Sequence, residues 1–217
     1  LTSTNYDDNK KKHVGGKNGY GAKLTNIYSI EFHIETADGK NKYSQTFYDN
    51  MSRKDKPKIV KSKIKPYTSI RYKPDYKRFN LENISPDMIS IMKRRAYDMA
   101  ICADKANIYY NNSKITCKNF ENYMDYYIGS DSIKALDKTN RWEIGVALNN
   151  TETFESISFV NGINTSNGGK HVDYVVNQIA KKMIEWIHKK KKITIKPNFI
   201  KDNIIIFIKC TIDDPSF

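Results

Sequence analysis

The chain has 217 residues, of which 39% are hydrophobic and 28% are charged, the composition of a soluble globular protein with one large or two smaller domains. Its net charge of +13, from 37 basic and 24 acidic residues, favours a polyanionic partner such as nucleic acid, although lysine is also a common solubilising residue. No apolar run approaches the roughly 20 residues of a membrane-spanning helix, so we expect no membrane partner.

The first distinctive pattern in the chain is a stretch rich in glycine and lysine, which comes just before an apolar helical run from Leu24. Its residues are Gly15, Gly16, Lys17, Asn18, Gly19, Tyr20, Gly21, Ala22 and Lys23. Glycine lets the backbone approach an anion closely, and the start of a helix directs several N–H groups to one place. The pattern favours a phosphate-binding loop, although it is not a P-loop. An ordinary glycine-rich turn is the alternative.

Alternating apolar and polar residues then predict a β-hairpin. Phe32 and Ile34 alternate with polar neighbours, and Asp38-Gly39 supplies a turn signal. The expected strands of this part of the chain lie at 31–35, 43–49 and 68–72, with a basic, irregular stretch at 53–65.

A helix start follows at Ser85-Pro86-Asp87, which combines a capping residue, a proline for the first turn and an acid near the positive end of the dipole. Apolar residues then recur at helical spacing: Met88, Ile91, Met92, Ala96, Met99 and Ala100. A short hairpin is expected at 108–115. We place the boundary between two α+β units near residues 117–119.

The second half of the chain predicts more strands and one long helix. Residues 120–128 favour a helix, and 141–149 alternate as a strand that we expect to pair with 156–160 through the turn at 149–152. The clearest amphipathic stripe predicts a helix from about Lys170 to His188. The apolar run 204–208 predicts a central strand covered on both faces.

A run of lysines follows that long helix. His188, Lys189, Lys190, Lys191 and Lys192 form a concentrated positive patch without base-reading geometry, which suits contacts with the phosphates of duplex DNA. The alternative is a frayed, solvated helix end whose lysines complement the helix dipole.

Other chemistry-bearing residues form no catalytic or metal-binding pattern. The three cysteines make no C-x-x-C pair, and we expect reduced thiols without zinc. The glycine-rich loop at 164–171 is interpreted as a structural entry to the long helix, with His171 as a hydrogen-bonded structural residue. We therefore predict no catalytic residue and no metal ligand in this chain.

Several motifs together resemble eukaryotic type II DNA topoisomerases over essentially the whole chain. The family carries a Thr-Ser-Ser-Asn-Tyr-Asp-Asp segment and a Gly-Gly-Arg-Asn-Gly-Tyr-Gly-Ala-Lys loop, similar to residues 2–8 and 15–23 here. Later motifs follow in the same order: Tyr48-Asp49-Asn50-Met51, Arg94-Arg95-Ala96-Tyr97-Asp98, Arg141-Trp142-Glu143, Ser158-Phe159-Val160-Asn161, Gly168-Gly169-Lys170-His171-Val172-Asp173-Tyr174-Val175 and Asp214-Pro215-Ser216-Phe217.

The resemblance implies an α+β fold in two parts. Residues 1–118 would be the C-terminal part of a GHKL (Bergerat) α/β sandwich that binds nucleotide. Residues 119–217 would be part of a transducer domain of the ribosomal S5 domain 2-like type.

The resemblance also implies which residues contact ATP. Ser3, Thr4 and Asn5 would lie near its ribose and phosphates, although such residues also cap helices and turns. The loop from Gly16 to Lys23 would surround the triphosphate, with Lys23 as a point charge. Lys17 stands where the family often has arginine, which keeps the charge and loses the bidentate fork.

In the family, the glutamate that activates water, the asparagine that holds Mg²⁺ and a Gln-Thr-Lys loop match no residue of this chain. We therefore expect a homodimeric nuclear parent enzyme that binds ATP and Mg²⁺ and passes one DNA duplex through another, while these 217 residues alone are inactive. The alternatives are a basic nucleic-acid-binding module without nucleotide chemistry, and a chaperone or mismatch-repair relative.

Overall fold

The computed structural model describes residues 3, 5, 7, 9–16, 18–103, 105–117 and 119–217. These residues form two compact units. The first contains the described residues of Leu1–Asp8 together with Gly16–Ile89, and the second contains Asn9–Gly15 together with Ser90–Phe217. The boundary between the two compact units falls at 89/90 in the main part of the chain. The boundary at 118/119, which the resemblance implies between the nucleotide-binding and transducer domains, stays a prediction.

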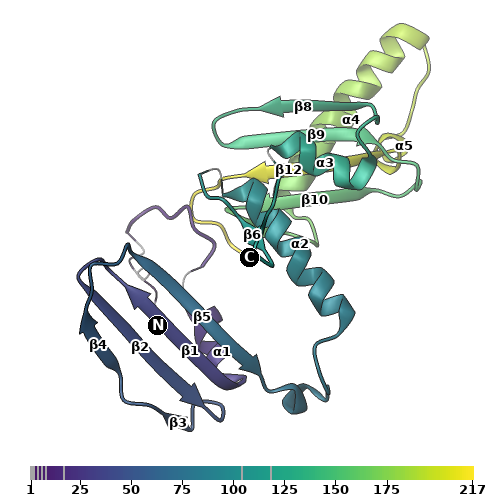
Figure 1. Cartoon of the computed structure of the whole chain (residues 1–217). Helices are drawn as coiled ribbons and strands as arrows, with labels where there is room; N and C mark the ends of the chain where they lie inside the picture. Colours follow the sequence, from purple (N-terminus) through teal and green to yellow (C-terminus); the bar gives the residue numbers. More distant parts are fainter. Residues whose placement is uncertain are drawn as a thin grey trace. The chain divides into compact units, whose positions relative to one another are not determined.

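The first unit is an antiparallel sheet with one helix against it (Figure 1). Its strand order is β3-β2-β1-β5, and β4 also pairs with β2. The helix α1 contacts β1 and β5. The elements follow along the chain as α1 (Tyr20–Ile27), β1 (Ser29–Ala37), β2 (Asn41–Tyr48), β3 (Arg53–Lys54), β4 (Lys58–Lys61), β5 (Tyr67–Pro74) and the 3-10 helix η1 (Tyr76–Phe79).

The predicted hairpin is confirmed by β1 and β2. Phe32 is fully buried and pairs with Phe47, and Ile34 is also buried, as the alternation of β1 predicts. Asp38 closes the turn, because its Oδ1 accepts hydrogen bonds from the N–H groups of Lys40 (2.8 Å) and Asn41 (2.6 Å).

The second unit contains a mixed sheet of order β11-β10-β12-β9-β8 and a separate two-stranded hairpin, β6-β7. Helix α2 (Pro86–Cys102) begins in the first unit and ends in the second. The remaining elements are β6 (Tyr109–Tyr110), β7 (Ser113–Lys114), α3 (Phe120–Ile128), β8 (Lys134–Lys138), β9 (Trp142–Leu148), β10 (Glu155–Val160), β11 (Ile163–Asn164), α4 (Lys170–Lys191), α5 (Pro197–Asp202) and β12 (Ile204–Cys210).

The expected pairing of 141–149 with 156–160 is wrong. β12 lies between these strands, antiparallel to β9 and parallel to β10. A parallel pair needs a crossover connection, and α4 and α5 provide it between β10 and β12. The short turn after β9 therefore does not join neighbouring strands.

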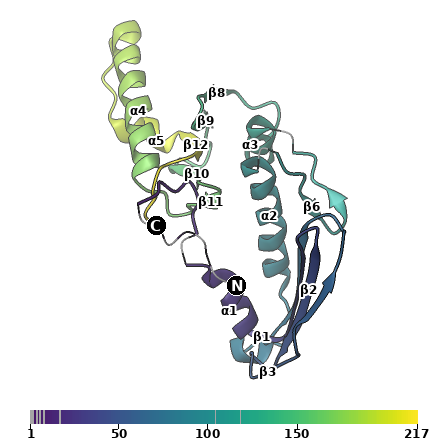
Figure 2. The same ribbon diagram turned by 90° about the vertical axis from the view of Figure 1, so that its left-hand side faces the viewer.

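Strand β12 occupies the centre of the sheet and is covered on both faces, as its apolar sequence predicts. On one face, Ile205 and Phe207 pack in a cluster with residues of α3 and the end of α2. On the other, Ile206 and Ile208 pack with residues of α4 and α5. The second unit therefore has three layers, and the C-terminal part of α4 extends beyond the sheet in both views (Figures 1 and 2).

Helix α2 begins where its sequence predicts, but only Ala96 and Ala100 of its predicted apolar stripe pack against the core. The backbone N–H of Met88 donates to Ser85 Oγ (3.2 Å), which confirms the cap. The apolar stripe stays largely exposed, with Ile91 55% exposed, whereas Asp98 and Ile101 are buried. No helix in the described part of the chain is long and apolar enough to cross a membrane.

Candidate functional site

The N-terminus of α1 is the centre of the candidate phosphate site. Its N-cap residue, Gly19, has φ 65°, a left-handed conformation that suits glycine. Within the described residues no side chain caps this helix, and its first turn holds no acidic residue. The first N–H groups of the helix and the positive end of its dipole are therefore available to an anion.

The structure brings the two predicted nucleotide segments together. The side-chain amide of Asn5 donates through Nδ2 to the carbonyl oxygen of Gly16 (2.9 Å), which links residues 3–5 to the glycine loop. The backbone N–H of Asn5 also donates to Ser3 Oγ (3.0 Å), a local turn contact of the kind expected in the alternative interpretation. Thr4 and Lys17 lie outside the described residues, and the nucleotide roles of the others stay predictions.

Two glycines near the start of α1 have open space around them. A Cβ atom added to Gly16 or Gly21 would meet no atom of the described residues within 4 Å. The Tyr20 side chain is 60% exposed, and the Lys23 ammonium lies 5.9 Å from the centroid of its ring. This cation–π contact holds a positive charge and an aromatic face together in the first turn of α1, beside Ala22.

The opposite end of α1 is fixed by a motif to which the sequence assigned no role. Asn50 donates through Nδ2 to the carbonyl oxygen of Ile27 (2.9 Å), and its own N–H donates to Ser29 O (3.0 Å). Asp49, Asn50 and Met51 all have positive φ angles, between 52° and 68°, so the turn after β2 is tightly constrained. This turn anchors α1 against the sheet.

The basic patch lies at the C-terminal end of α4. The helix includes Lys189, Lys190 and Lys191, so the run does not follow the helix as expected but forms its last turn. Lys192 is the C-cap, with φ 57°, and His188 and all four lysines are exposed. Trp186, 59% exposed, lies in the same part of the helix. Contact between this patch and DNA therefore stays a prediction. The positive charges of the patch also complement the negative end of the helix dipole.

His171, in the glycine-rich entry to α4, makes the hydrogen bond expected for it. Its Nε2 lies 3.0 Å from Thr165 Oγ1, and the backbone N–H of Thr165 donates to Ser158 O (2.8 Å). Burial lowers the pKa of His171 below its usual value, so the neutral ring is favoured.

The described residues contain no group of three or more His, Cys, Asp or Glu side chains that could hold a metal ion. The three cysteines are free thiols, and burial raises the pKa of Cys210 to about 11 and raises that of Cys117. Cys117 and Cys210 are therefore protonated thiols rather than reactive thiolates near neutral pH.

Comparison with solved structures identifies an ATPase region. The chain superposes along its whole length on the ATPase region of Saccharomyces cerevisiae topoisomerase II, with a TM-score of 0.90, 43% identity and 58% of that chain covered. It matches the ATPase and transducer domains of DNA topoisomerase II from Balamuthia mandrillaris with the same TM-score, at 37% identity and 57% coverage of that chain. The α+β fold expected from the sequence is confirmed.

Comparison of sequences gives the family. Residues 101–217 match the sequence model described as DNA gyrase B, so the chain belongs to the DNA gyrase B family. Over its whole length it is 42% identical to DNA topoisomerase 2 of Candida glabrata and 45% identical to that of Acanthamoeba polyphaga mimivirus. The chain spans 17% and 18% of these two relatives. The resemblance seen in the motifs is confirmed.

Proposed function

We propose that this chain binds the phosphates of ATP at the start of α1, as part of the ATPase region of an ATP-dependent type II DNA topoisomerase. The observation that carries the proposal is the uncapped N-terminus of α1, preceded by a glycine loop that Asn5 holds through Gly16. Whole-length similarity to ATPase regions supports the choice of ATP over other anions.

The residues at the loop fit a triphosphate. The first N–H groups of α1 provide donors in a fixed direction, and Lys23 adds a charge that screens phosphate oxygens. Because the space next to Gly16 and Gly21 is open, phosphates approach the backbone closely. ATP supplies the phosphoryl group, while these residues bind and orient it. The asparagine that holds Mg²⁺ in the family matches no residue here, so we expect the Mg²⁺ that accompanies ATP to be held by other residues of the parent enzyme.

In the parent enzyme, ATP binding closes a dimeric gate around a DNA duplex, and hydrolysis resets that gate. The basic end of α4 contacts the captured duplex through its phosphates. The names of the relatives support this assignment, and the eukaryotic sources of several of them support a nuclear location. The catalytic glutamate and the Gln-Thr-Lys loop of the family match no residue here, so we expect the 217 residues alone not to hydrolyse ATP at an appreciable rate.

A titration of the chain with a non-hydrolysable ATP analogue tests the nucleotide site. The change Lys23→Ala is expected to weaken binding about ten-fold to a hundred-fold, because one charge-assisted hydrogen bond is worth about 1.5–3 kcal/mol. Lys40→Ala removes an exposed lysine from the β1–β2 turn and serves as the matched control. Equal affinity in the Lys23 and Lys40 variants would contradict the site.

The alternative of a basic nucleic-acid-binding module predicts a different result. Such a chain binds DNA in a steeply salt-dependent way but shows no saturable binding of the ATP analogue. The similarity to ATPase regions favours nucleotide binding, and the same titration distinguishes the two functions.

A further inference from the structure

The segment that leads into the glycine loop belongs to the other unit. Residues 9–15, which we call the connector, group with the second unit, whereas Gly16 begins the main part of the first. A single peptide bond therefore joins the segment packed on the second sheet to the loop proposed to hold the triphosphate. The position of Gly15 limits the positions that Gly16 can take.

A pair of hydrogen bonds fixes the backbone of the connector to the C-terminal segment of the chain. The N–H of Lys12 donates to Asp214 Oδ1 (3.0 Å), and the N–H of Asp214 donates to the carbonyl oxygen of Lys12 (3.0 Å). Neither bond depends on the lysine side chain. The C-terminal segment is itself fixed, because Asn161 donates to Ile212 O and accepts from Ile212 N, each at 2.8 Å.

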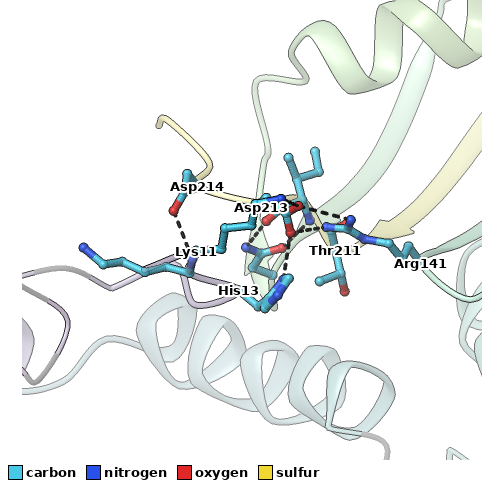
Figure 3. Close-up of polar contacts among 9 residues, drawn as sticks. Lys11, His13, Arg141, Thr211, Asp213 and Asp214 are labelled. Atoms are coloured by element: carbon cyan, nitrogen blue, oxygen red, sulfur yellow. Dashed lines mark hydrogen bonds and ion pairs between the residues drawn. The ribbon is translucent and has the colours of Figure 1, made fainter. Parts of the chain in front are cut away.

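The Asp213 carboxylate lies beside basic side chains of the connector and beside Arg141 (Figure 3). Its Oδ1 lies 2.6 Å from Arg141 Nη2 and 3.1 Å from His13 Nδ1, and its Oδ2 lies 3.8 Å from Lys11 Nζ. Arg141 also donates through Nε to the carbonyl oxygen of Thr211 (3.0 Å). The carboxylate thus joins the connector to the residue that precedes β9 and to the residues that follow β12.

The connector also fits closely at its last residue. A Cβ atom added to Gly15 would lie 1.9 Å from Ile163 Cδ1, far inside any real packing distance. Ile163 belongs to β11, at the edge of the second sheet. A side chain at residue 15 would therefore force the Ile163 side chain to move.

We propose that the connector couples phosphate binding at the glycine loop to the C-terminal segment of the second unit, with Asp213 as the positioning residue. The inference rests on the proposed function. The docked connector restricts the backbone at Gly15, which is bonded to the first residue of the loop, so fewer loop conformations remain to be lost when phosphates bind. By reciprocity, a nucleotide that orders the loop must also stabilise the docked connector.

The test uses the full 217-residue chain, the same ATP analogue and amide hydrogen exchange. In the unaltered chain, the analogue is expected to slow exchange at the amides of Lys12 and Asp214. The change Asp213→Asn is expected to speed that exchange without ligand and to weaken analogue binding about five-fold or more. Asp213→Glu keeps the carboxylate and should recover part of the affinity. Asp137→Asn, at an exposed site on β8, is the matched control.

The outcomes separate the two proposals. Saturable binding that is unchanged by Asp213→Asn, or binding that leaves the connector amides unprotected, overturns the coupling but not the nucleotide site. An unaltered chain that binds no analogue overturns the proposed function and the coupling with it. If Asp213→Asn does not fold, Gly15→Ala replaces it in the test. This change disturbs the packing of the connector against Ile163 and must also weaken analogue binding.

Discussion

Asp98 is a buried carboxylate, only 1% exposed, and its partners explain why it is tolerated. The Tyr123 hydroxyl donates to Asp98 Oδ1 (2.6 Å), and Arg95 Nη1 lies 3.2 Å from Oδ2. The Tyr123 and Tyr127 hydroxyls also lie 2.9 Å apart. Burial, followed by the hydrogen bond to Asp98, raises the pKa of Tyr123 far above its usual value, so the phenol remains a donor.

Removing the Tyr123 hydroxyl should therefore be costly. Tyr123→Phe leaves a buried carboxylate without one of its donors, and we expect the free energy of unfolding to fall by about 1–3 kcal/mol. Tyr126→Phe changes the same group on the same helix at a residue that is 59% exposed, and should stay within about 0.5 kcal/mol of the unaltered chain. Chemical denaturation measures both, and equal effects would contradict the role of the buried pair.

The Asp213 cluster predicts a pH dependence with a definite sign. The hydrogen bond from Arg141, and then the nearby charges of Arg141, His13 and Lys11, hold the pKa of Asp213 below its usual value. A carboxylate whose pKa is lowered on folding stabilises the folded state at pH values above about 4, its pKa in the unfolded chain. This contribution disappears as the pH falls through the lower pKa of the folded chain.

The measurement compares the denaturation midpoints of the unaltered chain and Asp213→Asn. Their difference should persist down to about pH 5 and should shrink towards zero as the pH falls below about 4. A difference that stays undiminished well below about pH 4 would show that the carboxylate does not stabilise the connector.

Strand β9 shows how one glycine sets the distance between a helix and a sheet. A Cβ atom on Gly145 would lie 2.3 Å from Met124 Sδ, and Met124 of α3 is fully buried. The glycine therefore creates the space into which α3 packs. The alternating sequence around Gly145 gave no indication of this packing, because Met124 belongs to another element.

The last turn of α4 leads to a prediction about DNA. Changing Lys189–Lys192 to glutamine should reduce affinity for duplex DNA and flatten its salt dependence, by about 0.9 in the log–log slope for each phosphate that the variant no longer neutralises. The control removes the same charge from exposed lysines of the first unit: Lys56, Lys58, Lys61 and Lys63. Fluorescence anisotropy at several salt concentrations measures both variants. Equal slopes would show that net charge alone attracts DNA.

The two units have separate hydrophobic cores. Phe32 and Ile34 form the buried side of the first sheet, whereas two clusters cover the faces of β12 in the second unit. Since each core is contained within its own unit, local stability need not be shared between them.

A core substitution in the second unit should therefore act locally. Ile206→Ala, at a fully buried position of β12, is expected to cost about 2–5 kcal/mol in that unit. Amide exchange should become faster in β9, β10 and β12, while the amides of β1 and β2 keep their protection. A matched drop in protection in both units would show that they unfold together.

Local patterns in the sequence were enough to predict those elements whose structure depends on residues nearby in the chain. The Asp38-Gly39 turn, the Ser85 cap, the amphipathic stripe of α4 and the apolar run of β12 each have their cause within a few residues. The glycine loop before α1 also has a local pattern, the backbone freedom of glycine at the start of a helix, and the anion site that this pattern indicates stays a prediction.

Tertiary structure decided the features that join distant residues. β12 enters between β9 and β10, Asp98 is buried against Tyr123, and Asp214 holds Lys12 across 202 positions of the chain. Local propensity carries no information about such pairs, because their free energy comes from packing and hydrogen bonds that form only when the whole chain is folded. The connector is the clearest case: its lysines resemble a solvated run in the sequence, and only the fold places its backbone against Asp214.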